Sequence, residues 1–284
     1  MHRMKALLDT IKFEHTIFAL PFALLSLFLA SNGWPRSDVL LWVVIAMVGA
    51  RSSAMMMNRI VDRHIDAKNP RTANRQLPSG VVSVPAAWVF TLGSAALFVF
   101  AAAQLNPLAF ALSPVALAVV WAYSWTKRFT WAAHLWLGVS LGLAPLGAWI
   151  AVQGRLEVTP LLLGLGVLLW VAGFDTIYSC QDESFDRQHG LHSLPARLGA
   201  RRALQLARIF HALMLAVFFV LGVWIHSTWI YWLGLVVVAG LVVVQHRLVN
   251  HQDLTHINVA FFNVNSIVGV LLLVFTLADR FLLG

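Results

Sequence analysis

Segments of about 20 apolar residues recur along almost the whole chain, and each is long enough to cross a bilayer as an α-helix. Nine such segments are predicted, at residues 16–31, 39–58, 85–104, 107–125, 131–152, 159–178, 203–225, 229–245 and 257–278. Only 11% of the 284 residues are charged and 60% are hydrophobic, whereas soluble domains have roughly 25% charged residues. We therefore expect an all-α, polytopic membrane protein whose residues 1–284 form a single integral-membrane domain.

The basic residues are distributed unevenly between the two sides of these predicted spans. Sixteen of the 20 Lys and Arg residues lie in the N-terminal segment and in the loops after every second span, whereas Arg36, Arg155 and Arg280 lie on the opposite side. This bias is typical of the positive-inside rule, which places the N-terminus and these loops in the cytoplasm and the C-terminus outside. The net charge of +8 thus orients the chain in the membrane and does not indicate a nucleic-acid partner.

Two carboxylates stand directly after the second predicted span, although the chain has only 12 acids. If this span continues as a helix, Asn58, Asp62 and Asp66 follow one another at intervals of four residues and share one face. Carboxylates at membrane depth cost about 2.5–3.5 kcal/mol each, so we expect a positive charge or a metal ion to offset them.

The end of the sixth predicted span repeats this pattern. Tyr178, Asp182 and Asp186 are again four residues apart, and Asp175 stands two helical turns before Asp182. A continuous helix would place all four side chains on one face. Both acidic motifs fall in the two long loops of the predicted cytoplasmic side or at their edges.

Carboxylates without thiols or a histidine-rich pattern suit hard cations, and Mg²⁺ is usually held by one or two carboxylates plus substrate phosphates. Basic residues follow each motif, namely Arg71 and Arg75 after the first and Arg197, Arg201 and Arg202 after the second. A magnesium-bound phosphate group is the partner that this pattern favours. The alternative is that both acid pairs are simply solvated in cytoplasmic loops.

The remaining metal-ligating residue types show no comparable pattern. The 11 His residues form no recognisable ligand motif, and we interpret His189 and His192 as an exposed loop pair. The single cysteine, Cys180, excludes an internal disulfide and a cysteine-based metal cage.

With these motifs the chain resembles the UbiA superfamily of intramembrane prenyltransferases over essentially its whole length. The first motif matches the family pattern N-x-x-x-D-x-x-x-D, the second matches D-x-x-Y-x-x-x-D-x-x-x-D, and "RTANRQLPSG" matches the family's basic loop. The resemblance implies nine transmembrane helices around a central cavity, with a polyprenyl diphosphate bound through Mg²⁺, ionised to an allylic cation and transferred to an acceptor. One departure is Arg59, which stands where many members have Asp, so that any metal or phosphate role of this position is lost.

The resemblance also implies roles for individual residues. The implied catalytic residues are Asp62, Asp66, Asp175, Asp182 and Asp186. The implied metal ligands are Asn58, Asp62, Asp66, Asp182 and Asp186, the implied diphosphate-binding residues are Arg71, Arg75, Tyr123, Lys127 and Tyr178, and the implied acceptor-binding residues are Arg51 and Asn258.

Several of these residues have a structural alternative. Arg51 lies within a predicted span, where an ionisable residue indicates function, but it could instead pair with Glu14 or an Asp. Lys127 could be a plain positive-inside charge. Asn258, like Asn263 and Asn265, could bond only to neighbouring helices.

The quoted motifs look most similar to the bacterial 4-hydroxybenzoate polyprenyltransferase-like branch, which includes the 1,4-dihydroxy-6-naphthoate prenyltransferase. This implies a hydroxy-aromatic carboxylate acceptor in menaquinone or ubiquinone biosynthesis, and the naphthoate is slightly favoured over 4-hydroxybenzoate. It also implies a location in the bacterial inner membrane. One alternative is an ion-coupled secondary transporter that uses buried carboxylates, but both acidic motifs lie on the same predicted side of the membrane rather than forming an inverted pair. Another is an inactive family member, which the intact Asp residues argue against.

Overall fold

The computed structural model describes residue 10 and residues 18–283, and these residues form helices and no named strand. They divide into two compact units. The first unit comprises Met1–Thr16 and Ser37–Trp125, and the second comprises Ile17–Arg36 and Thr126–Gly284. Each acidic motif thus belongs to a different unit, Asp62 to the first and Asp182 to the second.

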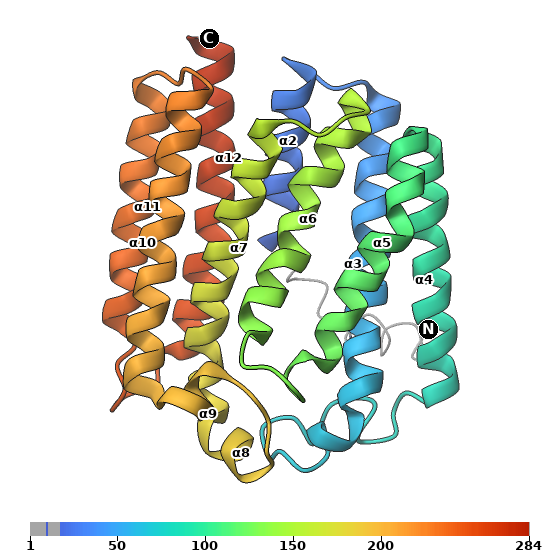
Figure 1. Cartoon of the computed structure of the whole chain (residues 1–284), viewed down its shortest axis with the longest axis vertical. Helices are drawn as coiled ribbons and strands as arrows, with labels where there is room; N and C mark the ends of the chain where they lie inside the picture. Colours follow the sequence, from blue (N-terminus) through green and yellow to red (C-terminus); the bar gives the residue numbers. More distant parts are fainter. Residues whose placement is uncertain (1–9, 11–17, 284) are drawn as a thin grey trace. The chain divides into compact units, whose positions relative to one another are not determined.

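The first unit is built from three long helices (Figure 1). These are α3 (Ser37–Asp66), α4 (Val84–Leu105) and α5 (Pro107–Thr126). Gly49 allows α3 to approach α4, because a Cβ atom there would lie 2.9 Å from the carbonyl oxygen of Ser94. The Ser53 hydroxyl joins all three helices, since it donates to the Thr91 carbonyl oxygen at 3.0 Å and accepts from the Trp121 indole at 3.0 Å.

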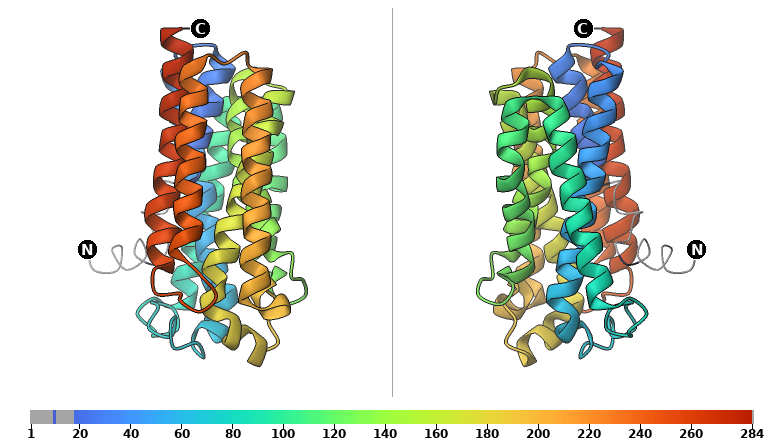
Figure 2. Two further views of the ribbon diagram at one scale, coloured as in Figure 1. Left: turned by 90° about the vertical axis from the view of Figure 1, so that its left-hand side faces the viewer. Right: turned by 90° about the vertical axis from the view of Figure 1, so that its right-hand side faces the viewer.

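The second unit contains the remaining helices (Figure 1). Its long helices are α2 (Leu20–Ser31), α6 (Ala133–Gln153), α7 (Val158–Ser179), α10 (Ala200–Trp224), α11 (Trp229–Leu248) and α12 (Asn265–Leu282). Short elements follow α7 and precede α12, namely η2 (Cys180–Asp182), α8 (Glu183–Gln188), α9 (Leu194–Leu198) and the π-helix η3 (Val259–Val264). The views in Figure 2 show α11 and α12 running side by side.

Helix α7 is the most buried span of the second unit, because it packs between α6 and α10. Gly138 and Gly142, one turn apart on α6, face the α7 backbone, and a Cβ atom at Gly142 would lie 2.7 Å from the carbonyl oxygen of Gly164. In a membrane, where lipid is as apolar as leucine, such small residues stabilise helix pairs by close van der Waals contact. The core around α7 includes Trp170 and Phe218, which are almost completely buried.

The helices confirm the predicted all-α membrane architecture. Eight described helical segments are long and apolar enough to cross a membrane, and α2 is a shorter apolar helix. The first predicted span begins at residue 16, which lies outside the described residues, as do Glu14 and the basic residues at positions 3, 5 and 12. The central cavity implied by the resemblance stays a prediction.

Candidate active site

The first acidic motif lies at the C-terminal end of α3, as its spacing predicts. The helix continues to Asp66, so that Asn58, Asp62 and Asp66 occupy three successive turns of one face. The Asn58 side chain donates a hydrogen bond to Oδ2 of Asp62 at 3.1 Å. Asp62 and Asp66 are both buried, with 2% and 5% exposure, so their charges need partners within the protein or in a ligand.

Arg75 supplies one such partner. Its Nη1 atom lies 2.9 Å from Oδ1 and 2.8 Å from Oδ2 of Asp66. The loop after α3 folds back far enough for this contact because the Thr72 hydroxyl donates to the backbone carbonyl of Asp66 at 3.0 Å. Arg71, by contrast, has an exposed side chain.

A second cation near this motif was missed by the sequence analysis. Arg59 is buried, donates from Nε to the Thr10 carbonyl oxygen at 3.3 Å, and is close enough to Asp62 and Asp66 for their charges to interact. The sequence analysis treated Arg59 only as the loss of a family Asp. Arg59 stands three residues before Asp62, and this spacing places both on nearly the same face of α3. The spacing could therefore have indicated that Arg59 lies near the motif.

The other predicted ligand-binding residues of the first unit are half-buried. Arg51 lies on α3 two turns before Asn58, and Tyr123 lies in the last turn of α5. The charge of Arg59 also interacts with Tyr123, which places this tyrosine on the same side of the unit as the first acidic motif.

The second acidic motif departs from the predicted continuous helix. Helix α7 ends at Ser179, and the 3₁₀ turn η2 separates it from α8. The prediction that Asp175, Tyr178, Asp182 and Asp186 share one uninterrupted helical face is therefore wrong. A 3₁₀ turn advances three residues per turn instead of 3.6 and shifts the phase of the residues after it.

Side chains at this break satisfy carbonyl groups of the last turn of α7. The Cys180 thiol donates to the Thr176 carbonyl oxygen at 3.4 Å, and the Gln181 amide donates to the Tyr178 carbonyl oxygen at 3.0 Å. These bonds replace some of the backbone hydrogen bonds that a continuing α-helix would provide to these carbonyl groups. Cys180 is a buried free cysteine.

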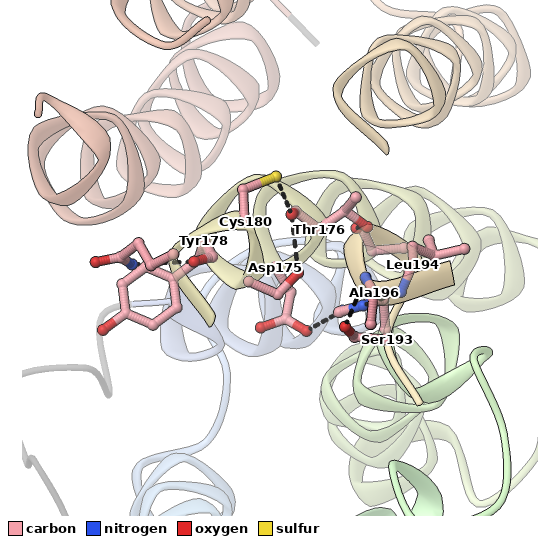
Figure 3. Close-up of polar contacts among 11 residues, drawn as sticks. Asp175, Thr176, Tyr178, Cys180, Ser193, Leu194 and Ala196 are labelled. Carbon is pink, nitrogen blue, oxygen red and sulfur yellow. Dashed lines mark hydrogen bonds and ion pairs between the residues drawn. The ribbon is translucent and has the colours of Figure 1, made fainter. Parts of the chain in front are cut away.

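Asp175 is held by a histidine that the sequence analysis did not single out. His134, at the start of α6, has its Nδ1 atom 2.6 Å from Oδ2 of Asp175. Figure 3 shows Asp175 pointing toward Ser193 and Leu194 at the start of α9, whereas the side chain of Tyr178 points away from them. The residues His134 and Asp175 are 41 positions apart, so no local pattern could join them.

The remaining acids after α7 have different partners. Asp186 is half-buried and is close enough to the Ser193 side chain and to Lys127 to interact with both. Glu183 instead accepts from the backbone N–H of Ala200 at 2.9 Å and from Arg187 at 2.9 Å, so it holds the start of α10. His189 and His192, as expected, are exposed.

The π-helix η3 packs against α7 beside the second motif. The ring of Phe261 lies against that of Tyr178, with 4.1 Å between centroids. Asn265, fully buried, accepts from the Trp170 indole at 2.9 Å and donates to the Phe261 carbonyl oxygen at 2.8 Å. Asn265 thus bonds to neighbouring helical segments, whereas the side chain of Asn258 is exposed.

The donor chemistry of the motifs fits a hard divalent cation. Among the residues that the structure describes, no three Asp, Glu, His or Cys side chains are grouped closely enough to hold a metal ion by themselves. Mg²⁺ does not need such a cage, because it usually binds one or two carboxylates together with substrate phosphates and water. Asp62, with the amide of Asn58 beside it, offers that kind of oxygen donor on one helix face.

Comparisons with known proteins agree on one family. The family model of the UbiA prenyltransferase family matches residues 19–267. The 4-hydroxybenzoate octaprenyltransferase of Methylobacillus flagellatus is 30% identical over 255 residues, which cover 90% of this chain and 86% of that protein.

Solved structures show the same fold. A UbiA homolog from Aeropyrum pernix K1 superposes with a TM-score of 0.85 and 35% identity over 94% of this chain and 98% of that one. A UbiA homolog from Archaeoglobus fulgidus bound to GPP and Mg²⁺ superposes with a TM-score of 0.74, and at 18% identity over 97% and 99% of the two chains it supports the fold alone.

Proposed function

Because the chain belongs to the UbiA prenyltransferase family, we propose that it transfers a polyprenyl group from a polyprenyl diphosphate to the ring of a hydroxy-aromatic carboxylate. The acceptor would be 1,4-dihydroxy-6-naphthoate or 4-hydroxybenzoate, and the product would enter menaquinone or ubiquinone biosynthesis. The family model spans both units, which supports a single prenyltransferase domain over residues 1–284. The observation that carries the proposal is the presence of both intact acidic motifs, each at the C-terminal end of an apolar helix.

In this proposal the acidic motifs hold the diphosphate through Mg²⁺. The metal ligands would be Asn58, Asp62, Asp66, Asp182 and Asp186. Bound Mg²⁺ would neutralise the negative charge that develops on the diphosphate as it leaves. The buried position of Asp62 supports its role, because a buried carboxylate is a stronger partner for a cation than one in water.

Side chains of the protein would complete the binding of the diphosphate. Arg71, Arg75, Tyr123, Lys127 and Tyr178 would donate hydrogen bonds to its oxygen atoms, since Arg and Lys recognise phosphate through charge-assisted bonds. Arg75 would be shared between Asp66 and the diphosphate, because its guanidinium has more donors than the contact with Asp66 uses.

The transfer itself breaks the bond between the first prenyl carbon and the diphosphate oxygen. A bond from that carbon to the acceptor ring then forms, and the ring loses a proton to restore its aromaticity. The apolar helices would keep water away from the allylic cation. Arg51 would bind the carboxylate of the acceptor and Asn258 would contact the acceptor as well.

The charge distribution supports a membrane orientation for this reaction. We propose that the protein is a multi-pass protein of the bacterial inner membrane, with the N-terminus and both acidic motifs on the cytoplasmic side and the C-terminus outside. The substrates would then be a polyprenyl diphosphate from the bilayer and a water-soluble aromatic acid from the cytoplasm.

One assay tests the proposal. Purified protein would be incubated with Mg²⁺, a polyprenyl diphosphate and each of the two aromatic acids in turn, and the products identified by mass. The relative from Methylobacillus flagellatus supports 4-hydroxybenzoate, whereas the motifs look most similar to the 4-hydroxybenzoate polyprenyltransferase-like branch, which also includes the 1,4-dihydroxy-6-naphthoate prenyltransferase. Replacing Asp62 or Asp182 with Ala should abolish transfer while the protein remains monodisperse, and replacing the exposed Asp253 should not. Turnover in either motif variant would remove the magnesium-diphosphate assignment.

A further inference from the structure

His134 joins the first acid of the second acidic motif to the start of α9. Its Nδ1 atom lies 2.6 Å from Oδ2 of Asp175, the first acid of that motif. Its Nε2 atom accepts a hydrogen bond from the backbone N–H of Leu194 at 3.3 Å, and Leu194 follows Ser193, whose side chain lies near Asp186. The imidazole itself is buried, with 5% of its side chain exposed.

The contact with Leu194 fixes which nitrogen of the ring carries the proton. A backbone N–H can only donate, so Nε2 must be the unprotonated acceptor. The single proton of a neutral imidazole is then on Nδ1, where it is donated to Asp175. Asp175 therefore accepts a hydrogen bond from this nitrogen.

The same contact completes the first turn of α9. Leu194 is the first residue of this helix, where backbone N–H groups have no intrahelical acceptor. Pro195 has no N–H to satisfy, and the N–H of Ala196 is accepted by the Ser193 side chain at 3.2 Å. His134 accepts the hydrogen bond from the remaining N–H group, that of Leu194. The labelled residues of Figure 3 show this turn directly beside Asp175.

The Ser193 side chain extends the network to the third acid of the motif. Its oxygen atom accepts from the N–H of Ala196, and the Ser193 side chain lies close enough to Asp186 to interact with its carboxylate. A break in the bond between His134 and Leu194 would release the turn that carries Ser193. Loss of the imidazole would thus free Asp175 directly and Asp186 indirectly.

We propose that His134 is a positioning residue of the prenyltransferase site, a neutral bridge protonated on Nδ1 that fixes Asp175 and the Ser193–Leu194 turn in the arrangement that binds the magnesium diphosphate. This inference rests on the proposed function. His134 itself touches neither the diphosphate nor the metal in this scheme. It acts as an outer partner that orients the Asp175 carboxylate, and removing comparable hydrogen-bond partners typically reduces metal affinity or activity by about 10–100-fold.

Three variants separate the two contacts of His134. In His134→Asn the side-chain amide takes the place of Nδ1 and can still donate to Asp175. In His134→Gln the amide takes the place of Nε2 and can still accept from Leu194, whereas His134→Ala loses both contacts. The matched control is His189→Ala, because His189 is exposed and its ring contacts Phe185, by stacking and through Nδ1 at 3.0 Å from the backbone carbonyl oxygen.

The kinetic test compares the parameters for the prenyl diphosphate with those for the aromatic acid. We expect His134→Ala to lower kcat/KM for the prenyl diphosphate and raise the Mg²⁺ concentration for half-maximal rate by about 10–100-fold. The KM for the aromatic acid should stay within about twofold, and His134→Asn should recover most of the loss while His134→Gln recovers less. A merely structural histidine would affect all parameters alike, and equal activity of His134→Ala and the wild type would overturn the proposal.

A spectroscopic readout is independent of turnover. In protein labelled with ¹⁵N-histidine, two-bond proton–nitrogen correlations identify the protonated nitrogen, and the His134→Asn spectrum assigns the signal of His134. We expect a proton on Nδ1 and none on Nε2. A proton on Nε2 would overturn the bridge even in an active enzyme. If the wild type forms no prenylated product with either acid, the proposed function fails, whereas the tautomer measurement still decides the bridge.

Discussion

Arg75 donates from a single nitrogen to both carboxylate oxygens of Asp66, at 2.9 and 2.8 Å. The sequence analysis assigned these two residues to different partners, the arginine to the diphosphate and the aspartate to the metal. Their direct contact indicates that the basic loop after α3 also serves to hold the acidic motif. Asp66 is buried, so a carboxylate without this partner would be costly.

We therefore expect Arg75→Met to lower the thermal stability of the purified protein, because it leaves Asp66 as a buried charge without its nearest cation. A hydrogen bond to a charged group contributes about 1.5–3 kcal/mol, and the partial exposure of Arg75 favours the lower end. The double variant with Asp66→Asn should recover part of the loss, since the buried charge is then absent. Thermal unfolding in detergent measures both effects. Additive losses in the double variant would show that the two side chains are not coupled.

Arg51 provides a test of acceptor binding. It lies within a membrane-spanning helix, where an ionisable side chain usually serves a function. Arg51→Ala should raise the KM for the aromatic acid roughly tenfold or more and leave the KM for the prenyl diphosphate nearly unchanged, because only the acceptor has a carboxylate. The control is Arg36→Ala, which removes an exposed arginine from the loop between α2 and α3. A larger rise in the KM for the prenyl diphosphate than in the KM for the aromatic acid would contradict the assignment of Arg51 to the acceptor.

The first acidic motif could be predicted from the sequence because its geometry is local. A helix that continues past the apolar segment brings residues four positions apart onto one face, whatever the rest of the fold does. Asn58 and Asp62 meet for this reason. The long apolar segments were equally predictable, since a chain in a bilayer must satisfy its backbone groups within each helix.

Contacts between distant segments could not be predicted in this way. His134 precedes Leu194 by 60 residues, and nothing in the local sequence of either residue indicates the other. Arg59 was misjudged because only its replacement of the family's Asp was considered. Its burial close to Asp62 was not considered.

The contact between α6 and α7 gives a prediction about folding. Gly138 faces the carbonyl oxygen of Leu168, where an added Cβ atom would clash with the backbone. Gly138→Ala should destabilise the protein by about 1–3 kcal/mol, because the two helices must move apart. Gly147 is the matched control on the same helix, since no atom lies within 4 Å of its Cβ position. Thermal unfolding should separate the two variants, and equal midpoints would contradict the close helix contact.

Asp279 gives a prediction remote from the acidic motifs. It lies near the end of α12 and accepts hydrogen bonds from the backbone N–H groups of Thr228, at 2.9 Å, and Tyr231, at 3.0 Å. Thr228 precedes α11 but makes no capping bond with its own side chain, so Asp279 caps this helix from a neighbouring one. A carboxylate at a helix N-terminus is also stabilised by the helix dipole.

We expect Asp279→Ala to lower stability by about 2–3 kcal/mol, because buried donors lose a charged acceptor. Asp279→Asn should lose less, since one carbonyl oxygen can still accept. Asp253, which accepts from the N–H and hydroxyl of Thr255 in an exposed loop, is the control and should leave the unfolding midpoint unchanged when replaced with Ala. Because Asp279 is a cap and has no role in transfer, kcat measured well below the unfolding midpoint should be unaffected. A loss of kcat without a loss of stability would show that this carboxylate does more than cap α11.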